Sequence, residues 1–124
     1  MAKLLASTNI TITKTWFQQP NGFTYPIALR VPTIQSLANK EIPVAILLHG
    51  MGGSGESELN SWNSILPDHI LVAPTGYLNS WNIATEDSKA PDVAMLQELV
   101  EKLLLYFLFH YVKKRYFQVL HTSV

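Results

Sequence analysis

The feature that most constrains the fold is a continuous apolar run, Pro43–Leu48, followed at once by the glycine-rich segment His49–Gly55. The run has no alternation of polar and apolar residues, which is typical of a strand covered on both faces by helices. Glycine allows sharp turns and close backbone approaches. The pair predicts a central strand of an α/β sheet, with a turn at its carboxyl end where such sheets bind ligands.

Hydrophobic periodicity predicts the remaining elements. The first two extended segments flank a turn and predict an antiparallel hairpin at a sheet edge. Because strands and helices then alternate, we expect one α/β domain over residues 1–124, with a mostly parallel sheet, the N-terminal antiparallel hairpin, and helices on both faces. The expected elements are strands at 10–17, 24–31 and 43–48, a helix at 56–66, a strand at 70–73, a helix from Pro91 to Phe107 and a strand at 116–120.

Composition disfavours several classes of protein. Lys plus Arg and Asp plus Glu number nine each, so no net positive field attracts nucleic acid or an anionic membrane. There is no cysteine, and the four histidines lack metal-ligand spacing, so we expect neither a metal nor a cofactor. The apolar run Leu103–Val112 is shorter than the ~20 residues needed to span a bilayer. The N-terminus lacks a signal-peptide pattern, so we expect a cytoplasmic protein.

Three chemistries compete for the glycine-rich segment. Gly50–Gly55 fits the dinucleotide-binding pattern G-x-G-x-x-G, but Pro74–Gly76 stands where an acidic residue should bind the ribose, and Glu56 would repel a pyrophosphate. Glu56 also replaces the lysine of a Walker loop. The third chemistry is an oxyanion hole, in which main-chain N–H groups point at the charge that develops on a carbonyl oxygen. A turn that needs glycine for geometry alone is the remaining alternative.

Four segments, in this order and spacing, carry a resemblance to a known family. They are Ile46–Gly55, Ile70–Gly76, Ser80–Asn82 and Asp92–Leu96. Together they resemble the polyhydroxybutyrate depolymerase and feruloyl-esterase-like branch of the α/β-hydrolases, from about Val44 to Phe107. The resemblance implies part of an α/β-hydrolase sheet and a serine esterase that acts on small acyl esters.

The resemblance also implies roles for single residues of the glycine-rich segment. The N–H of Met51, helped by that of Gly52, would form part of the oxyanion hole. His49 and Gly50 would shape the loop, and His49 would not be the catalytic base.

Two further residues are implied in the pocket. Trp81 and Asn82 would line the mouth of the ester pocket, although an aromatic residue beside a turn is equally typical of ordinary packing. Asp92 stands in the first turn of a predicted helix, where an acidic side chain favours the helix dipole.

The nucleophile of this fold is expected on a G-x-S-x-G turn, which the sequence lacks. Aligning Val119–Ser123 with the family's strand and turn places Ser123 at the nucleophile position, with His121 in place of the first glycine. A shift by one residue places Thr122 there, and a solvated tail residue is the other interpretation of Ser123. The acid and the histidine that should follow have no counterpart before Val124. We therefore expect an incomplete, N-terminal part of the domain with little or no esterase activity alone.

A binding module is the competing class of function. The glycine-rich loop would then hold a nucleotide, or the apolar helix end around Tyr106, Phe107, Phe109 and Tyr111 would contact a partner chain. An uncovered sheet edge after the last strand would also allow copies of the chain to self-associate.

Overall fold

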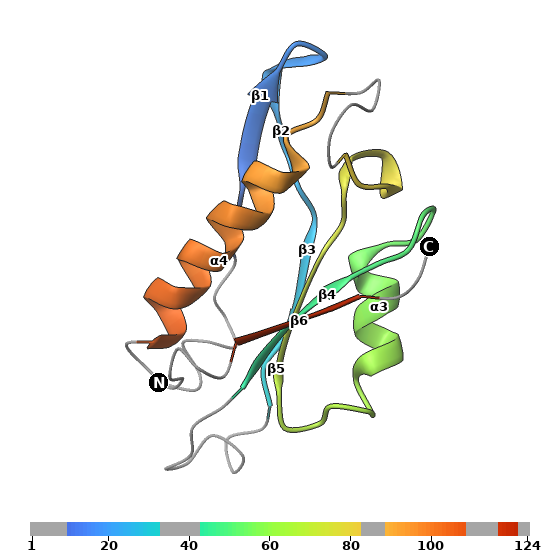
Figure 1. Ribbon diagram of the computed structural model, residues 1–124, viewed down its shortest axis with the longest axis vertical. Coiled ribbons are helices and arrows are strands. Elements are labelled where there is room, and N and C mark those ends of the chain that lie inside the picture. The colour runs from blue at the N-terminus through green and yellow to red at the C-terminus, as the bar shows by residue number, and fades with distance from the viewer. Residues whose placement is uncertain (1–9, 33–42, 83–88, 109–116, 122–124) are drawn as a thin grey trace.

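The computed structural model describes residues 10–32, 43–82, 89–108 and 117–121, with only the backbone described for 106–108 and 117–121. A mixed four-stranded sheet lies at its centre (Figure 1). Its strands are β3 (Ile27–Arg30), β4 (Val44–Leu48), β5 (Ile70–Pro74) and β6 (Phe117–His121), in the spatial order β3-β5-β4-β6. The predicted α/β composition is confirmed, and the strands expected at 43–48, 70–73 and 116–120 are present.

The expectation of a mostly parallel sheet is not confirmed. β4 is parallel to both β5 and β6, but β3 is antiparallel to β5. A second, separate sheet consists of β1 (Thr13–Trp16) and β2 (Gln19–Thr24), which are antiparallel. The chain therefore combines a parallel centre with antiparallel pairings at its N-terminal side.

The N-terminal hairpin exists, but its second arm is not the predicted one. β2 pairs with β1, whereas the expected partner segment, 24–31, mostly becomes β3 and joins the main sheet. Tyr25 and Pro26 separate the two strands. Pro26 has no N–H to donate to a strand ladder. The extended run therefore breaks there, and its two parts belong to different sheets.

Helices cover the opposite faces of the main sheet (Figure 1). Successive residues of a strand point to opposite faces, and β4 and β5 are apolar on both. One face packs against α4 (Asp92–Leu108), the other against α3 (Gly55–Trp62). The first cluster includes Val44, Ile46, Ile70, Val72, Met95, Leu99 and Leu103, and the second includes Ala45, Leu47, Leu71, Ala73, Leu59 and Trp62.

Local chemistry accounts for the start of each helix. The Ser54 hydroxyl accepts a hydrogen bond from the Ser57 N–H at 3.1 Å, which caps α3. In α4, Met95 N–H donates to Pro91 at 2.9 Å, so the first helical bond closes on the proline that the sequence places at the helix start. α3 ends at Trp62, earlier than the expected Leu66. Neither helix, within the described part of the chain, is long and apolar enough to cross a membrane.

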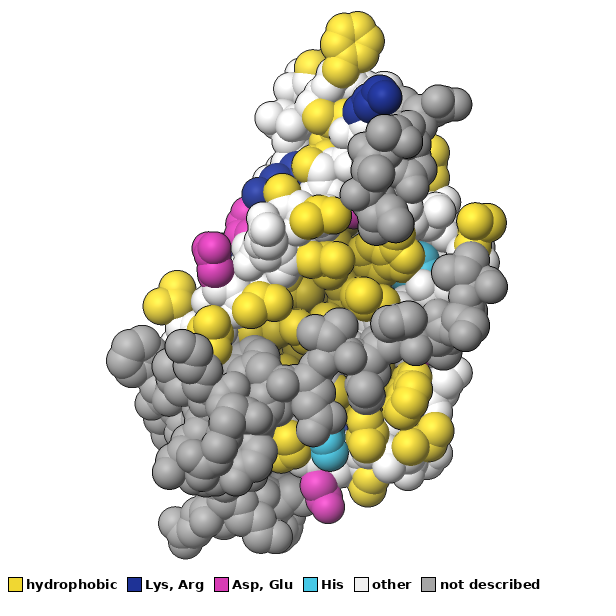
Figure 2. Space-filling model, viewed as in Figure 1, with side chains coloured by type: hydrophobic (Ala, Val, Ile, Leu, Met, Phe, Trp, Pro, Cys, Tyr) yellow, Lys and Arg dark blue, Asp and Glu magenta, His cyan; other side chains and the backbone are white. Residues whose placement is uncertain are grey.

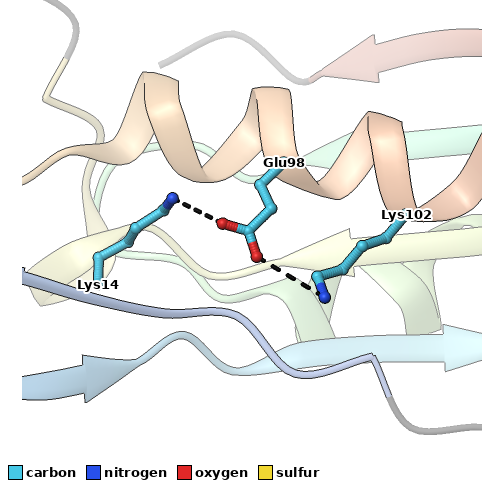
Figure 3. A network of polar contacts seen from close by, with 3 residues as sticks. All are labelled: Lys14, Glu98 and Lys102. Carbon is cyan, nitrogen blue, oxygen red and sulfur yellow. Dashed lines mark hydrogen bonds and ion pairs between the residues drawn. The ribbon is translucent and has the colours of Figure 1, made fainter.

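A polar network joins the hairpin to α4 (Figure 3). Lys14 Nζ on β1 donates to Glu98 Oε1 at 2.6 Å, and Lys102 Nζ lies 3.8 Å from Glu98 Oε2. The hydrogen bond from Lys14, with the positive charges nearby, lowers the pKa of Glu98. Because the Glu98 side chain is 33% exposed, this network orients the hairpin more than it stabilises the fold.

Arg30 and His69 lie at the amino end of the parallel strands. The Arg30 guanidinium donates to the main-chain carbonyls of Asn63, Leu66 and His69 at 3.1, 2.6 and 2.8 Å, and so holds the segment that follows α3. His69 Nδ1 is buried without a hydrogen-bond partner among the described residues. Burial lowers the pKa of His69; Arg30 acts in the same direction, and Asp68 opposes them.

We expect the protein to lose stability as the pH falls below about 6.5, the pKa of an unperturbed histidine. In that range the unfolded chain binds a proton at His69 before the folded chain does, because the folded pKa is lower. The contribution is fully present above pH 6.5 and is lost as the pH falls through the folded pKa. Urea unfolding at pH 8.0 and 5.5 measures it. The His69→Gln variant should show a smaller difference between the two pH values, and an unchanged difference would contradict this assignment.

Candidate functional site

The glycine-rich loop follows β4, and the next two strands of the chain lie on opposite sides of β4 in the sheet. β4 leads through α3 to β5 on one side, and β5 leads through α4 to β6 on the other side of β4. The helices of these two connections lie on opposite faces, so the connections diverge at the carboxyl ends of the neighbouring strands β4 and β5. Open α/β sheets bind ligands in the crevice at such a switch point. The loop 49–55, which leaves β4 there, is therefore the candidate site.

His49 fastens this loop to the end of β5. Its side chain is 2% exposed, and Nε2 accepts a hydrogen bond from the Gly76 N–H at 3.0 Å. Nδ1 lies 2.6 Å from the carbonyl oxygen of Gly50, which only accepts, so Nδ1 carries the proton in this arrangement. Both ring nitrogens are thus engaged. In this geometry His49 shapes the loop and has no nitrogen free to take a proton from a nucleophile.

Trp81 contacts the loop directly, whereas Asn82 contacts residues near the start of α4. The Trp81 indole N–H donates to the His49 carbonyl at 2.9 Å, and the two rings stack with centroids 4.8 Å apart. Asn82 Nδ2 donates to the Ala90 carbonyl at 2.7 Å, toward the start of α4. Trp81 therefore supports the loop, and the lining of the cleft beside the loop does not include it.

The two implied oxyanion donors differ in their availability. The Gly52 N–H donates to the Asn79 carbonyl at 2.8 Å, so in this conformation it does not provide the oxyanion donor that the resemblance implies. The Gly53 N–H donates to Gly50 at 3.0 Å. The Met51 N–H has no hydrogen-bond partner among the described residues, and the Met51 side chain is 72% exposed. The loop thus presents one unused donor next to two that are engaged.

Asn79 and Leu78 were not identified from the sequence. They belong to the 3₁₀ turn η1 (Tyr77–Asn79) and have positive φ angles of 59° and 56°. The Asn79 side chain donates to the Gly53 carbonyl at 2.8 Å. Asparagine tolerates this conformation, which is a weak sequence signal, but leucine rarely adopts it. Strained backbone of this kind is held by its surroundings and clusters at functional sites.

A surface cleft of about 330 Å³ adjoins the loop. Its volume is at the lower end of the range of small-molecule sites. Ser54 of the loop and Glu56, which follows the loop, both line the cleft, so a molecule in the cleft would lie beside the glycine-rich segment. The lining consists of Pro26, Ile27, Ala28, Ser54, Glu56, Thr75 and Asn79.

A second hollow lies on α4, away from the glycine-rich loop. A shallow groove of about 610 Å³ is lined by Val93, Leu96, Gln97, Val100 and Glu101. Figure 2 shows hydrophobic side chains gathered on this face of the molecule. The aromatic side chains that the sequence places at the end of this helix lie outside the described side chains, so this groove does not test the predicted contact with a partner chain.

The nucleophile position lies outside the described residues, since both Ser123 and Thr122 follow them. The end of β6 is nevertheless placed, because His121 is in register with Leu48 on the parallel neighbour β4. The carboxyl end of β6 therefore lies at the same end of the sheet as the glycine-rich loop.

In the described part of the chain, no group of three or more His, Asp or Glu side chains is arranged to hold a metal ion. Comparisons of the chain with protein-family models, characterised proteins and solved structures find no match.

Proposed function

We propose that this chain contributes the oxyanion-binding part of a serine carboxylic-ester hydrolase. In this proposal the main-chain N–H of Met51 donates to the negative charge that develops on the carbonyl oxygen of an acyl ester. The observation that carries it is the unused Met51 N–H, at the switch point of the sheet, beside the engaged N–H groups of Gly52 and Gly53. A donor that is held in place before the reaction stabilises the transition state without reorganising.

The position of β6 supports Ser123 as the nucleophile of the proposed reaction. The register of β6 with β4 places His121, two residues before Ser123, at the end of the sheet where the glycine-rich loop lies. The serine oxygen would attack the ester carbon, a base would take its proton, and the carbonyl oxygen would become the oxyanion. His49 is committed to the loop and does not serve as that base. We therefore expect little or no turnover by the 124-residue chain alone.

The same geometry disfavours a nucleotide in this loop. A phosphate cradle needs several main-chain N–H groups that point at one anion. Here the N–H groups of Gly52 and Gly53 donate to carbonyl oxygens of the protein itself. Glu56 also lines the adjoining cleft and would repel a phosphate. An uncharged carbonyl oxygen that acquires its charge during the reaction suits a single donor better.

The first test measures the hydrolysis of p-nitrophenyl butyrate by two proteins. One is the 124-residue chain. The other, here called the extended protein, is this chain joined to a segment that supplies an acid and a histidine, where the nucleotide sequence after the Val124 codon encodes such a segment in any frame. We expect the extended protein to hydrolyse the ester with sensitivity to a serine-directed phosphonate, and the shorter chain not to do so. Absence of turnover in the extended protein, or of any such segment, would count against the proposal.

The second test removes the donor itself. Met51→Pro deletes the N–H, and we expect kcat of the extended protein to fall by at least about a hundredfold, as for the loss of one oxyanion donor in other enzymes. Met51→Ala keeps the N–H and is the matched control, which should retain most of the activity. Circular dichroism checks that both variants fold. A folded Met51→Pro variant with unchanged kcat would show that Met51 is not the donor.

A further inference from the structure

One buried carboxylate, that of Asp92 at the start of α4, accepts hydrogen bonds from three residues in two other parts of the chain. The side chain is 1% exposed. Tyr25 Oη donates to Oδ1 at 2.6 Å, the Asn82 N–H donates to Oδ2 at 2.7 Å, and the Tyr77 N–H lies 3.5 Å from Oδ1. An acid that only balanced a helix dipole would not need these donors. Their number and burial indicate a role beyond the start of the helix.

We propose that Asp92 is a positioning residue that fastens the segment Gly76–Asn82, here called the covering segment, onto the glycine-rich loop. The covering segment contacts the loop directly at three of its residues. Gly76 N–H donates to His49 Nε2, Asn79 accepts from the Gly52 N–H, and the Trp81 indole donates to the His49 carbonyl. Asp92 binds the same segment near both of its ends, at Tyr77 and Asn82.

Backbone strain explains why the covering segment needs such a restraint. Leu78 and Asn79 both have positive φ angles, and residues in this conformation stay there only when their surroundings hold them. The bonds from Tyr77 and Asn82 to Asp92 flank this strained pair on either side. Asp92 thus acts on the two points between which the strain is held.

Tyr25 keeps the carboxylate itself in place. The Tyr25 side chain is 2% exposed, and its ring contacts Phe23 with centroids 5.1 Å apart. Burial, followed by the hydrogen bond to Asp92, raises the pKa of Tyr25 above its usual range. The hydroxyl therefore remains protonated and donates to Asp92 throughout the neutral pH range. In this way the region between β2 and β3 is linked to the covering segment.

Amide hydrogen exchange of the 124-residue chain, followed by NMR, tests the proposal independently of catalysis. Asp92→Asn preserves the shape of the side chain but replaces one acceptor oxygen with an NH₂ group that faces a donor. We expect exchange at Gly52, whose N–H bonds to the covering segment, to accelerate at least tenfold more than exchange at Val72 in the core of β5. Equal acceleration at both amides, or none at either, would overturn the proposal.

Two matched variants separate positioning from general destabilisation. Glu98→Gln makes the same acid-to-amide change later on α4, where it contacts Lys14 and Lys102, and should leave the ratio of the Gly52 and Val72 rates unchanged. Met95→Ala weakens the core on the same helix and should accelerate both amides together. If Asp92→Asn does not fold, Tyr25→Phe removes one donor to Asp92 and should raise the same ratio by a smaller factor. An unchanged ratio in Tyr25→Phe would then overturn the proposal.

The expected effect of Asp92 on catalysis rests on the proposed function. Different results would contradict the positioning role of Asp92 and the proposed esterase function. In the extended protein, a loosened covering segment should lower kcat of the Asp92→Asn variant more than it raises KM, because the Met51 donor would be less well held. Faster exchange at Gly52 with unchanged ester turnover would leave Asp92 as the positioning residue and count against the proposed esterase role of the loop. Unchanged exchange at Gly52 would count against Asp92 alone.

Discussion

Replacing Gly76 with alanine is expected to destabilise the protein by about 3 kcal/mol or more, as for severe overpacking at a buried site. A Cβ at this position would lie 1.7 Å from the Ser80 carbonyl oxygen and 2.8 Å from the Trp81 ring. The oxygen belongs to the backbone and cannot move aside as a flexible side chain would. The covering segment would have to shift as a whole, and with it the contact of Trp81 with His49. Urea unfolding measures the loss.

Gly52→Ala is the control for this prediction. A Cβ at Gly52 would meet nothing within 4 Å, but its φ angle of 80° is unfavourable for alanine. We therefore expect a loss of only about 1–2 kcal/mol, the cost of a single residue in the left-handed region. Equal losses in the two variants would show that the contact of Gly76 with Ser80 is not the source of the effect.

Leu99→Ala should destabilise the protein by about 2–5 kcal/mol, the range observed when a large buried aliphatic side chain is truncated. Leu99 is 0% exposed and lies in the cluster that joins α4 to β4 and β5. Its removal leaves a cavity that neighbours such as Met95 and Leu103 only partly fill. The free energy of unfolding in urea gives the size of the effect.

Leu105→Ala makes the same change on the same helix at a side chain that is 64% exposed. It should change the free energy of unfolding by no more than about 0.5 kcal/mol. A loss comparable to that of Leu99→Ala would mean that Leu105 is covered in solution, for example by a second chain. The protein concentration dependence of the unfolding midpoint would then identify self-association.

The elements that show a local or periodic pattern in the sequence were predictable. The unbroken apolar runs at β4 and β5 need burial on both faces, and the order of these strands with α3 and α4 follows from alternating periodicity. The turn at the glycine-rich loop was also predictable, because glycine after a buried strand is a local signal. Which of its N–H groups is free was not predictable, since the partner of Gly52 is the carbonyl of Asn79 in a different loop.

Pairing between distant segments was decided by the tertiary structure. The extended run 24–31 shows good strand propensity, but whether it pairs with β1 or β5 depends on the break at Pro26 and on the apolar surface that β5 offers. The role of Asp92 illustrates the same limit. Its position explained a helix start, while its partner Tyr25 lies 67 residues away in the sequence. Such a contact leaves no pattern in the chain around either residue.

The amino-acid sequence by itself determined the central strand, the glycine-rich turn after it and the helices that cover the sheet. These elements depend on the apolar pattern and the backbone freedom of residues that are close together in the sequence. The tertiary structure alone decided that β3 is antiparallel to β5, that His49 is occupied at both ring nitrogens, and that Asp92 holds the covering segment. The physical reason is that each hydrogen-bonding group can take only a small number of partners. Which donor meets which acceptor depends on groups that only the folded chain brings together.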